Sequence, residues 1–190
     1  MEALHLLVKD KGFKPKYEPY TYQIRAFVIA IYCGRILLLS PTASGKSLII
    51  YLIVRYLLKG HCKKILIIVP TISLVEQLYT DFEDYSSDNN WITEEHVHRV
   101  YAGKDKNTPK SVTISTWQSL QSMPPKFFQQ FDAVIGDECH LFKAKSLTKI
   151  MCHLTNAKYR IGTTGTLDGT QTHRLVLEGL FGPVERVITT

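Results

Sequence analysis

The sequence lacks any hydrophobic run long enough to cross a membrane. A membrane-spanning helix needs about 20 consecutive apolar residues, whereas the two longest apolar runs, residues 26–33 and 48–54, are soon followed by Arg35 and Arg55. Charged residues also interrupt the N-terminal apolar stretch, so the sequence gives no sign of a secretory signal peptide. We therefore expect an intracellular protein with no membrane partner.

Cysteine is scarce, and the sequence has no Cys-x-x-Cys pair, no internal repeat and no low-complexity tract. The four cysteines are Cys33, Cys62, Cys139 and Cys152. Three of them have a histidine neighbour, but adjacent residues rarely bind one metal ion together. We therefore expect reduced, buried thiols rather than a zinc site or a disulfide framework.

Neither sign of charge is concentrated in one block. Lysine and arginine number 23 against 17 acidic residues, which gives a net charge of +6. This excess favours an anionic partner, and nucleic acid is the first candidate. With 45% apolar and 21% charged residues, the 190-residue chain has the composition of a globular domain. It is long enough for one full core and too short for two.

Short apolar runs alternate with helical patterns along the chain. The expected strands cover residues 36–39, 65–69, 97–101, 112–115, 133–136 and 159–162. The expected helices cover residues 19–32, 46–58, 73–85, 117–122, 146–154 and 173–180, and another begins after residues 124–125. Strands that are apolar throughout and alternate with helices indicate a parallel sheet covered on both faces. We expect a three-layer α/β domain over residues 19–190, after a lysine-rich lead-in over residues 1–18 with a possible helix at residues 2–8.

A phosphate-binding loop is the strongest motif. Between an apolar strand and an apolar helix lie Ser40, Pro41, Thr42, Ala43, Ser44, Gly45, Lys46 and Ser47. Small residues let backbone N–H groups converge on phosphate oxygens, and the following helix directs its positive end there. The pattern predicts that Lys46 reaches the β- and γ-phosphates of ATP and that Ser47 binds Mg²⁺. Ser40 stands where the usual motif has glycine, which still permits the turn if its φ is negative.

A pair of carboxylates follows the strand at residues 133–136. Asp137 and Glu138 come at the carboxyl end of this strand, the edge at which ligands collect in a parallel sheet. Alone, such a pair is an ordinary acidic loop. With a phosphate loop in the same chain, Asp137 is predicted to hold Mg²⁺ through water, and Glu138 to orient or deprotonate the attacking water.

These motifs together resemble the DExH-box group of superfamily 2 helicases, and within it the phage UvsW-type recombination helicases. The resemblance covers residues 18–166 and rests on Ser-Gly-Lys-Ser, on Asp-Glu-Cys-His and on further blocks in the family's order. It implies that Gln23 reads the adenine and that His140 links the ATP site to the coupling motif, which contains Thr164 and Thr166. It also implies nucleic-acid backbone contacts from Pro70, Thr71, Gln77, Thr116 and Gln118.

Simpler roles stay open for several of these residues. Thr71 and Thr116 could merely cap helices, and His140 could be a histidine buried at a helix start. Trp117 could stack on a base or pack in the core. Tyr20 and Phe13 could stack on adenine or pack. Departures from the family pattern are Ile72 for arginine, and Gly165 and Leu167 in the coupling motif.

The resemblance implies a RecA-like lobe of an ATP-dependent helicase or translocase, with ATP and Mg²⁺ as cofactors. Its partner would be DNA ahead of RNA, with branched DNA in recombination or repair as the substrate, and its location the host cytoplasm if a phage encodes it. Only 24 residues follow Thr166, so we expect the second lobe, with its arginine finger, to lie outside this chain. An RNA helicase, a non-catalytic nucleotide-binding module and a small-molecule kinase are the alternatives.

Overall fold

The computed structural model describes residues 10, 12–41, 43–101, 107–167 and 170–188. Thr42 of the phosphate loop and the possible helix at residues 2–8 lie outside the described residues. The strands are β1 (Arg35–Leu39), β2 (Ile65–Val69), β3 (Val97–Val100), β4 (Val112–Thr116), β5 (Ala133–Gly136), β6 (Tyr159–Thr164) and β7 (Val184–Arg186). The helices are α2 (Thr21–Cys33), α3 (Lys46–Leu58), α4 (Ile72–Ser86), α5 (Thr93–His96), α6 (Trp117–Leu120), α7 (Pro125–Phe128), the 3₁₀ turn η1 (Cys139–Leu141), α8 (Ala144–His153) and α9 (Gln171–Phe181).

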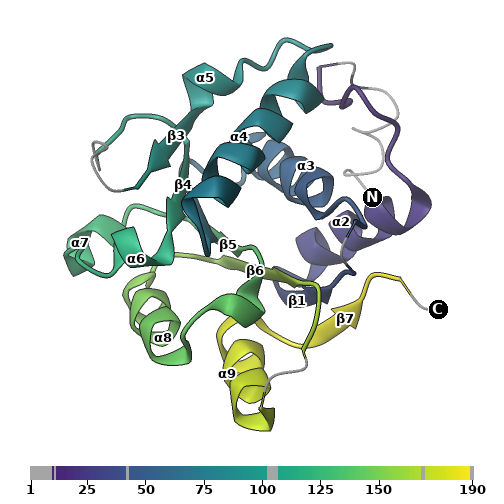
Figure 1. Ribbon diagram of the computed structural model, residues 1–190. Helices are drawn as coiled ribbons and strands as arrows, with labels where there is room; N and C mark the ends of the chain where they lie inside the picture. The colour runs from purple at the N-terminus through teal and green to yellow at the C-terminus, as the bar shows by residue number, and fades with distance from the viewer. Residues whose placement is uncertain (1–9, 11, 42, 102–106, 168–169, 189–190) are drawn as a thin grey trace.

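The seven strands form one sheet in the order β3-β4-β2-β5-β6-β1-β7, and every pairing is parallel. Figure 1 shows α2, α3 and α4 on one face of the sheet and α6, α7, α8 and α9 on the other. The expected three-layer α/β fold is therefore confirmed. Since all strands run the same way, their carboxyl ends share one edge and their amino ends share the opposite one.

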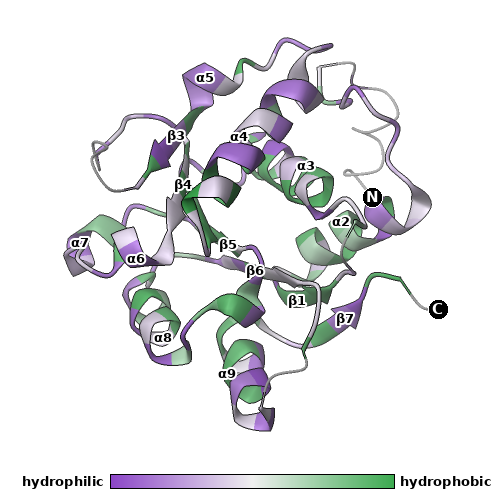
Figure 2. Ribbon diagram, viewed as in Figure 1, coloured by the Kyte–Doolittle hydropathy of each residue, from purple (hydrophilic) through white to green (hydrophobic). Residues whose placement is uncertain are grey.

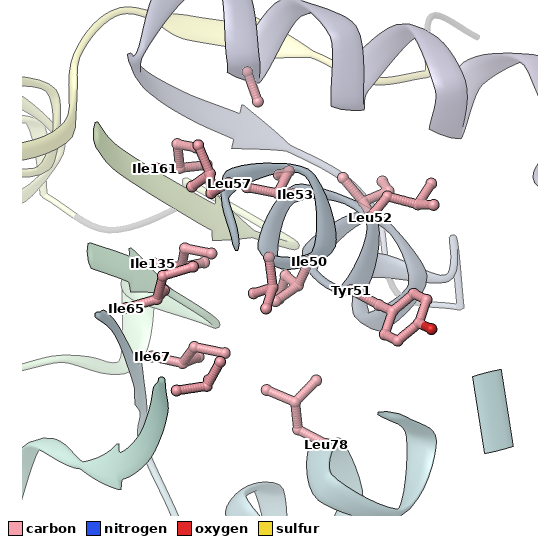
Figure 3. Close-up of a cluster of buried hydrophobic side chains, with 14 of the residues drawn as sticks. Ile50, Tyr51, Leu52, Ile53, Leu57, Ile65, Ile67, Leu78, Ile135 and Ile161 are labelled. Atoms are coloured by element: carbon pink, nitrogen blue, oxygen red, sulfur yellow. The ribbon is translucent and has the colours of Figure 1, made fainter. Parts of the chain in front are cut away.

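Helix α3 forms the centre of one face because it has no polar side. All its residues from Leu48 to Leu57 are buried, and Figure 2 shows it hydrophobic over most of its length. Figure 3 shows the contact with the sheet, where the strand residues Ile65, Ile67, Ile135 and Ile161 lie opposite Ile50, Ile53 and Leu57. Full burial of each such side chain contributes about 1.5–3 kcal/mol, so this contact fixes the helix that leaves the phosphate loop.

Alternate strand residues face the second core. Leu37, Leu66, Ile68 and Val134 point to the opposite side of the sheet, where α6, α7, α8 and α9 cover them. Strands whose two faces are both covered have no polar side. This explains why the sequence shows continuous apolar runs instead of alternation.

Several element boundaries differ from the sequence prediction. The first described helix begins at Thr21 rather than Pro19, and α4, α6, α8 and α9 differ from the prediction by one or two residues at their ends. Helix α3 has the predicted bounds. The last long strand continues through Thr164, two residues beyond its expected end at residue 162, so Thr163 and Thr164 belong to the sheet. Both threonines are buried by neighbouring strands, which favours extended backbone there.

Two short elements were missed by the sequence prediction. Helix α5 has four residues, and strand β7, near the C-terminal end of the described residues, has three. Strand β7 pairs in parallel with β1 through Leu37 and Val184. Neither element is long enough to show a hydrophobic repeat in the sequence. Each is therefore identified only by its contacts in the folded domain.

The described end of the lead-in packs on the domain. Phe13 is fully buried against α2 and α3, and the backbone N–H of Lys16 donates to the carbonyl of Tyr85. Packing is thus the role of Phe13 in this structure. The four thiols are free; Cys62 and Cys139 are buried as expected, whereas Cys33 and Cys152 are exposed, contrary to the prediction. Within the described ranges, no helix has the length and apolar character needed to cross a membrane.

Candidate nucleotide and nucleic-acid site

The phosphate loop joins the carboxyl end of β1 to the first turn of α3. Its backbone enters the left-handed region at Ala43 (φ 63°) and at Gly45 (φ 70°). Glycine at position 45 also leaves room for Gln23, because a Cβ there would overlap the amide nitrogen of that side chain. The tight turn that the small residues predicted is therefore present in the structure.

Ser40 replaces the usual glycine without strain, since its φ is not positive. The hydroxyl of Ser44 donates to the carbonyl of Pro41 (2.6 Å), and its oxygen lies 2.5 Å from the hydroxyl oxygen of Ser40. Because the Ser44 proton is already engaged, Ser40 donates this second bond. The backbone N–H of Ser40 also donates to the carbonyl of Thr164 (2.8 Å). The hydrogen bonds of Ser40 thus stabilise the conformation of the loop.

Lys46 and Glu138 meet at the centre of the site. The Lys46 ammonium lies 2.9 Å from Oε1 of Glu138 and 3.5 Å from the carbonyl oxygen of Ser40. The two side chains are 10% and 21% exposed, so this is a largely desolvated ion pair. Strand order explains the meeting: β6 lies between β1 and β5 and brings the two motifs to one edge.

Ser47 is held by residues of α4. Its hydroxyl lies 2.7 Å from the hydroxyl of Tyr85. Burial raises the pKa of Asp81, which lies one turn earlier on the same helix, while a hydrogen bond from Ser47 opposes the shift. Sequence reasoning missed both residues. Their spacing of four places them on one helix face, but no motif marks that face.

Asp137 is a buried carboxylate at the end of β5. One oxygen, Oδ1, accepts from the hydroxyl of Thr163 (2.5 Å) and from the backbone N–H of Glu138 (2.9 Å). Burial raises the pKa of Asp137, and the Thr163 hydrogen bond opposes this shift. Among the described residues, Oδ2 has no hydrogen-bond partner, so one carboxylate oxygen is free to bind a hydrated cation. This chemistry suits Mg²⁺, which prefers carboxylates and keeps several waters.

Glu138 has left-handed backbone geometry, with φ 50° and ψ 47°. A non-glycine residue in this region costs of order 1–3 kcal/mol and persists only where its surroundings demand it. Here the turn directs the carboxylate back toward Lys46. Its other oxygen, Oε2, accepts weakly from the backbone N–H of Gly165 (3.4 Å).

His140 connects the Asp-Glu turn to the end of β6. Its Nδ1 lies 2.8 Å from the hydroxyl oxygen of Thr164, which donates its own proton to the carbonyl of Thr166 (2.8 Å). The histidine must therefore carry a proton on Nδ1 and donate it to Thr164. Nδ1 also lies 3.4 Å from Oε2 of Glu138. The histidine is partly exposed in η1, so it is not the buried helix-start residue of the simpler alternative.

Gln23 is buried beneath the loop. Its Nε2 donates to the carbonyl of Ser44 (3.0 Å), and its Oε1 accepts from the backbone N–H of Tyr20 (2.8 Å). Tyr22 also donates to the carbonyl of Ser44 (3.1 Å). The ring of Tyr20 is 67% exposed and stacks on that of Tyr22. The glutamine thus braces the phosphate loop and lies beside an exposed aromatic ring.

The predicted nucleic-acid residues follow β2 and β4, which are neighbours. Thr71 caps α4, accepting from the N–H of Leu74, and Thr116 caps α6, accepting from the N–H of Ser119. The capping alternative therefore holds for both threonines, and phosphate contacts by them stay a prediction. Exposed Gln118 donates to the carbonyl of Pro70 (3.4 Å) and joins the two segments.

Two other candidate residues lie beside these segments. Gln77 is exposed on α4, six residues after the Thr71 cap. Trp117 is buried in the second core, with the Lys143 ammonium 6.0 Å from its ring centre. Packing is its role in this structure.

The phosphate loop after β1 and the carboxylates after β5, on a seven-stranded parallel sheet, define a RecA-like P-loop domain. A family described as "Type III restriction enzyme, res subunit" matches residues 16–169. The chain belongs to this family, which confirms the resemblance to the first lobe of superfamily 2 helicases.

The chain is similar in sequence and in structure to several named proteins. The chain is 34% identical over 177 residues to "ATP-dependent DNA helicase uvsW" of Enterobacteria phage T4, covering 91% of this chain and 34% of that protein. The crystal structure of T4 UvsW superposes with a TM-score of 0.86 at 32% identity, covering 100% of this chain and 39% of that one. A Sulfolobus solfataricus SWI2/SNF2 ATPase core in complex with dsDNA superposes with a TM-score of 0.70 at 18% identity, over 88% of this chain and 36% of that one, which shows the fold alone. The chain thus spans about a third of the length of its T4 relative.

Proposed function

We propose that this domain is the ATP-binding lobe of an ATP-dependent DNA helicase or translocase that acts on branched DNA in recombination or repair. The observation that carries the proposal is the meeting of Lys46, Asp137 and Glu138 at one sheet edge. The similarity to the T4 ATP-dependent DNA helicase supports DNA over RNA and ATP as the nucleotide.

Each loop residue has a proposed part in binding ATP. Lys46 exchanges Glu138 for the β- and γ-phosphates, and the backbone N–H groups of residues 43–47 surround the phosphate oxygens. The free oxygen of Asp137, through water, and the hydroxyl of Ser47 would hold Mg²⁺. When bound, this ion neutralises charge that develops on the phosphates. Gln23, already braced against the loop, offers its amide to the adenine edge.

Glu138 is the proposed general base. Once Lys46 turns to phosphate, the Glu138 carboxylate loses its counter-charge and can orient a water and accept its proton. Its backbone turn fixes the carboxylate at this place. Through His140, Thr164 and Thr166, the same turn is hydrogen-bonded to the end of β6, which we propose as the coupling route to the nucleic acid.

The nucleic-acid surface is proposed along Pro70, Thr71, Gln77, Thr116 and Gln118. The Gln118–Pro70 contact supports one continuous surface at the carboxyl edge. Contacts to the nucleic-acid backbone position the nucleic acid on the protein without recognising its base sequence. A second RecA-like lobe of the full-length enzyme would supply the facing half of this path and an arginine for the phosphates, consistent with the longer T4 relative.

The deciding experiment is steady-state ATP hydrolysis by the complete enzyme with branched DNA, linear duplex and RNA of equal length. We expect the largest stimulation by branched DNA and none in a Glu138→Gln control. Stimulation by RNA alone would favour an RNA helicase. Hydrolysis that is absent with every nucleic acid would favour a nucleotide-binding module.

A further inference from the structure

A large cavity lies at the sheet edge opposite the phosphate loop. Its volume is about 780 Å³. It is lined by the end of α3 and by residues that lie one or two positions before strands, among them Lys63, Ser111 and Asp132. In a parallel sheet these positions belong to the amino edge, whereas Ser40 and Asp137 follow the carboxyl ends of β1 and β5. The cavity is therefore separate from the nucleotide site.

A buried arginine faces this cavity without a carboxylate partner. Arg55 is 5% exposed, and its guanidinium donates to three neutral oxygens, those of the Tyr51 hydroxyl, the Asn89 side chain and the Gly12 carbonyl. No ion pair of Arg55 occurs among the described residues. Burial lowers the pKa of this arginine, against the attraction of Asp10, which is itself paired with Lys59. A buried cation without a direct ion pair is costly.

The rest of the lining adds positive charge. Lys59 and Lys63 also line the cavity, and Asp132 is its one carboxylate among the described lining residues. The Asp132 carboxylate already accepts from the backbone N–H groups of Lys63 (2.7 Å) and Lys64 (3.1 Å). Lys59 pairs with Asp10 outside the lining. The Lys63 ammonium has no partner in the part of the chain that the structure describes.

Aromatic rings at the cavity already stack on other side chains. The Trp91 ring stacks on His96 with centroids 5.1 Å apart, and the Arg55 guanidinium lies 5.0 Å from its centre. The His61 ring stacks on Tyr56. A ligand would thus be held through its charge and not by stacking of a base on Trp91.

We propose that this cavity is a second ligand site, which binds a small phosphate-bearing anion beside Arg55 and Lys63. A phosphate group supplies the direct ion pair that Arg55 lacks and accepts hydrogen bonds from the Lys63 ammonium. Because α3 runs from this cavity to the phosphate loop, an occupied site would stabilise both ends of that helix.

Pyrophosphate titration of the chain carrying Lys46→Ala and Trp117→Phe tests the proposal. The first change weakens anion binding at the phosphate loop, and the second leaves Trp91 as the single tryptophan, since the sequence has two. We expect a saturable change in Trp91 fluorescence and a rise in melting temperature with pyrophosphate. Sodium chloride at equal ionic strength should reproduce neither effect.

A matched pair of lysine variants makes the test specific. Adding Lys63→Gln should weaken pyrophosphate binding roughly tenfold, the factor for one lost charged hydrogen bond. Adding Lys149→Gln, which removes an exposed lysine of α8 outside the cavity, should leave binding unchanged. Equal dissociation constants for the two variants, or no saturable response, would overturn the proposal.

Discussion

The ammonium of Lys46 lies 2.9 Å from Oε1 of Glu138, so the predicted phosphate ligand and the predicted general base neutralise each other. Both side chains are largely buried, so water screens the attraction between the two charges only in part. ATP phosphates would compete with the carboxylate for the same cation. Binding of nucleotide and release of the proposed base would thereby be one event.

Lys46→Ala should weaken MgATP binding about tenfold to a hundredfold. The loop would then face phosphate charge without its cation, a loss comparable to one charged hydrogen bond of about 1.5–3 kcal/mol. Isothermal titration calorimetry measures the change, with Lys149→Ala on the exposed face of α8 as the control. Unchanged affinity of the Lys46 variant for MgATP would contradict the assignment of this segment as a phosphate-binding loop.

Glu138→Gln should keep ATP bound and slow hydrolysis by about 10²–10⁴, the usual contribution of a general base. The amide keeps the side-chain size but no longer pairs with Lys46, so nucleotide affinity should hold or increase. Single-turnover hydrolysis in the complete enzyme, beside equilibrium binding, separates the two effects. A parallel loss of affinity and turnover would instead mean that Glu138 holds the metal or the fold.

Gln23→Ala should relax the preference for ATP over GTP, because a site that pairs with a polar base edge rejects a mismatched one. It should also loosen the loop, since Gln23 donates to the Ser44 carbonyl. Tyr22→Phe removes a second bond to the same carbonyl and keeps the amide. If both variants lose affinity but keep the ATP/GTP ratio, Gln23 is a brace and not a reader of the base.

Asp137→Asn should raise the melting temperature and abolish hydrolysis. The asparagine Oδ1 can still accept from Thr163 and Glu138, while the buried charge is removed. Because burial raises the folded-state pKa of Asp137, the wild type loses stability as pH rises through that value. The advantage of the variant should thus be greatest at neutral pH, about 2–4 °C for each kcal/mol, and should fade toward pH ~4. A constant difference across pH would contradict this origin.

Residues 1–190 alone should hydrolyse ATP slowly, with little response to DNA. An arginine from a facing lobe contributes about 10³–10⁵ in rate in related phosphoryl-transfer enzymes. Binding of DNA by this stretch should be weak, independent of sequence and reduced by salt. Steady-state assays with and without branched DNA measure both quantities. Strong DNA-stimulated turnover by the monomer would require an arginine finger within these residues.

The sequence alone determined the local parts of this protein. Apolar runs such as residues 65–69 predict buried strands because both faces of a parallel sheet are covered. The small residues before Lys46 predict a tight phosphate-binding turn, and Asp137 and Glu138 follow a strand in the expected way. Each of these signals is carried by neighbours in the chain, so no long-range information is needed to find it.

Only the tertiary structure decided how these parts meet. The insertion of β6 between β1 and β5 lets Thr164 lie beside the phosphate loop and accept from His140. The contact of Tyr85 with Ser47 and the pairing of β7 with β1 have the same origin. Hydrophobic periodicity states which face of an element is buried but not which partner buries it. Strand order and side-chain contacts between distant segments come from packing the whole core at once, and that packing assembled the site.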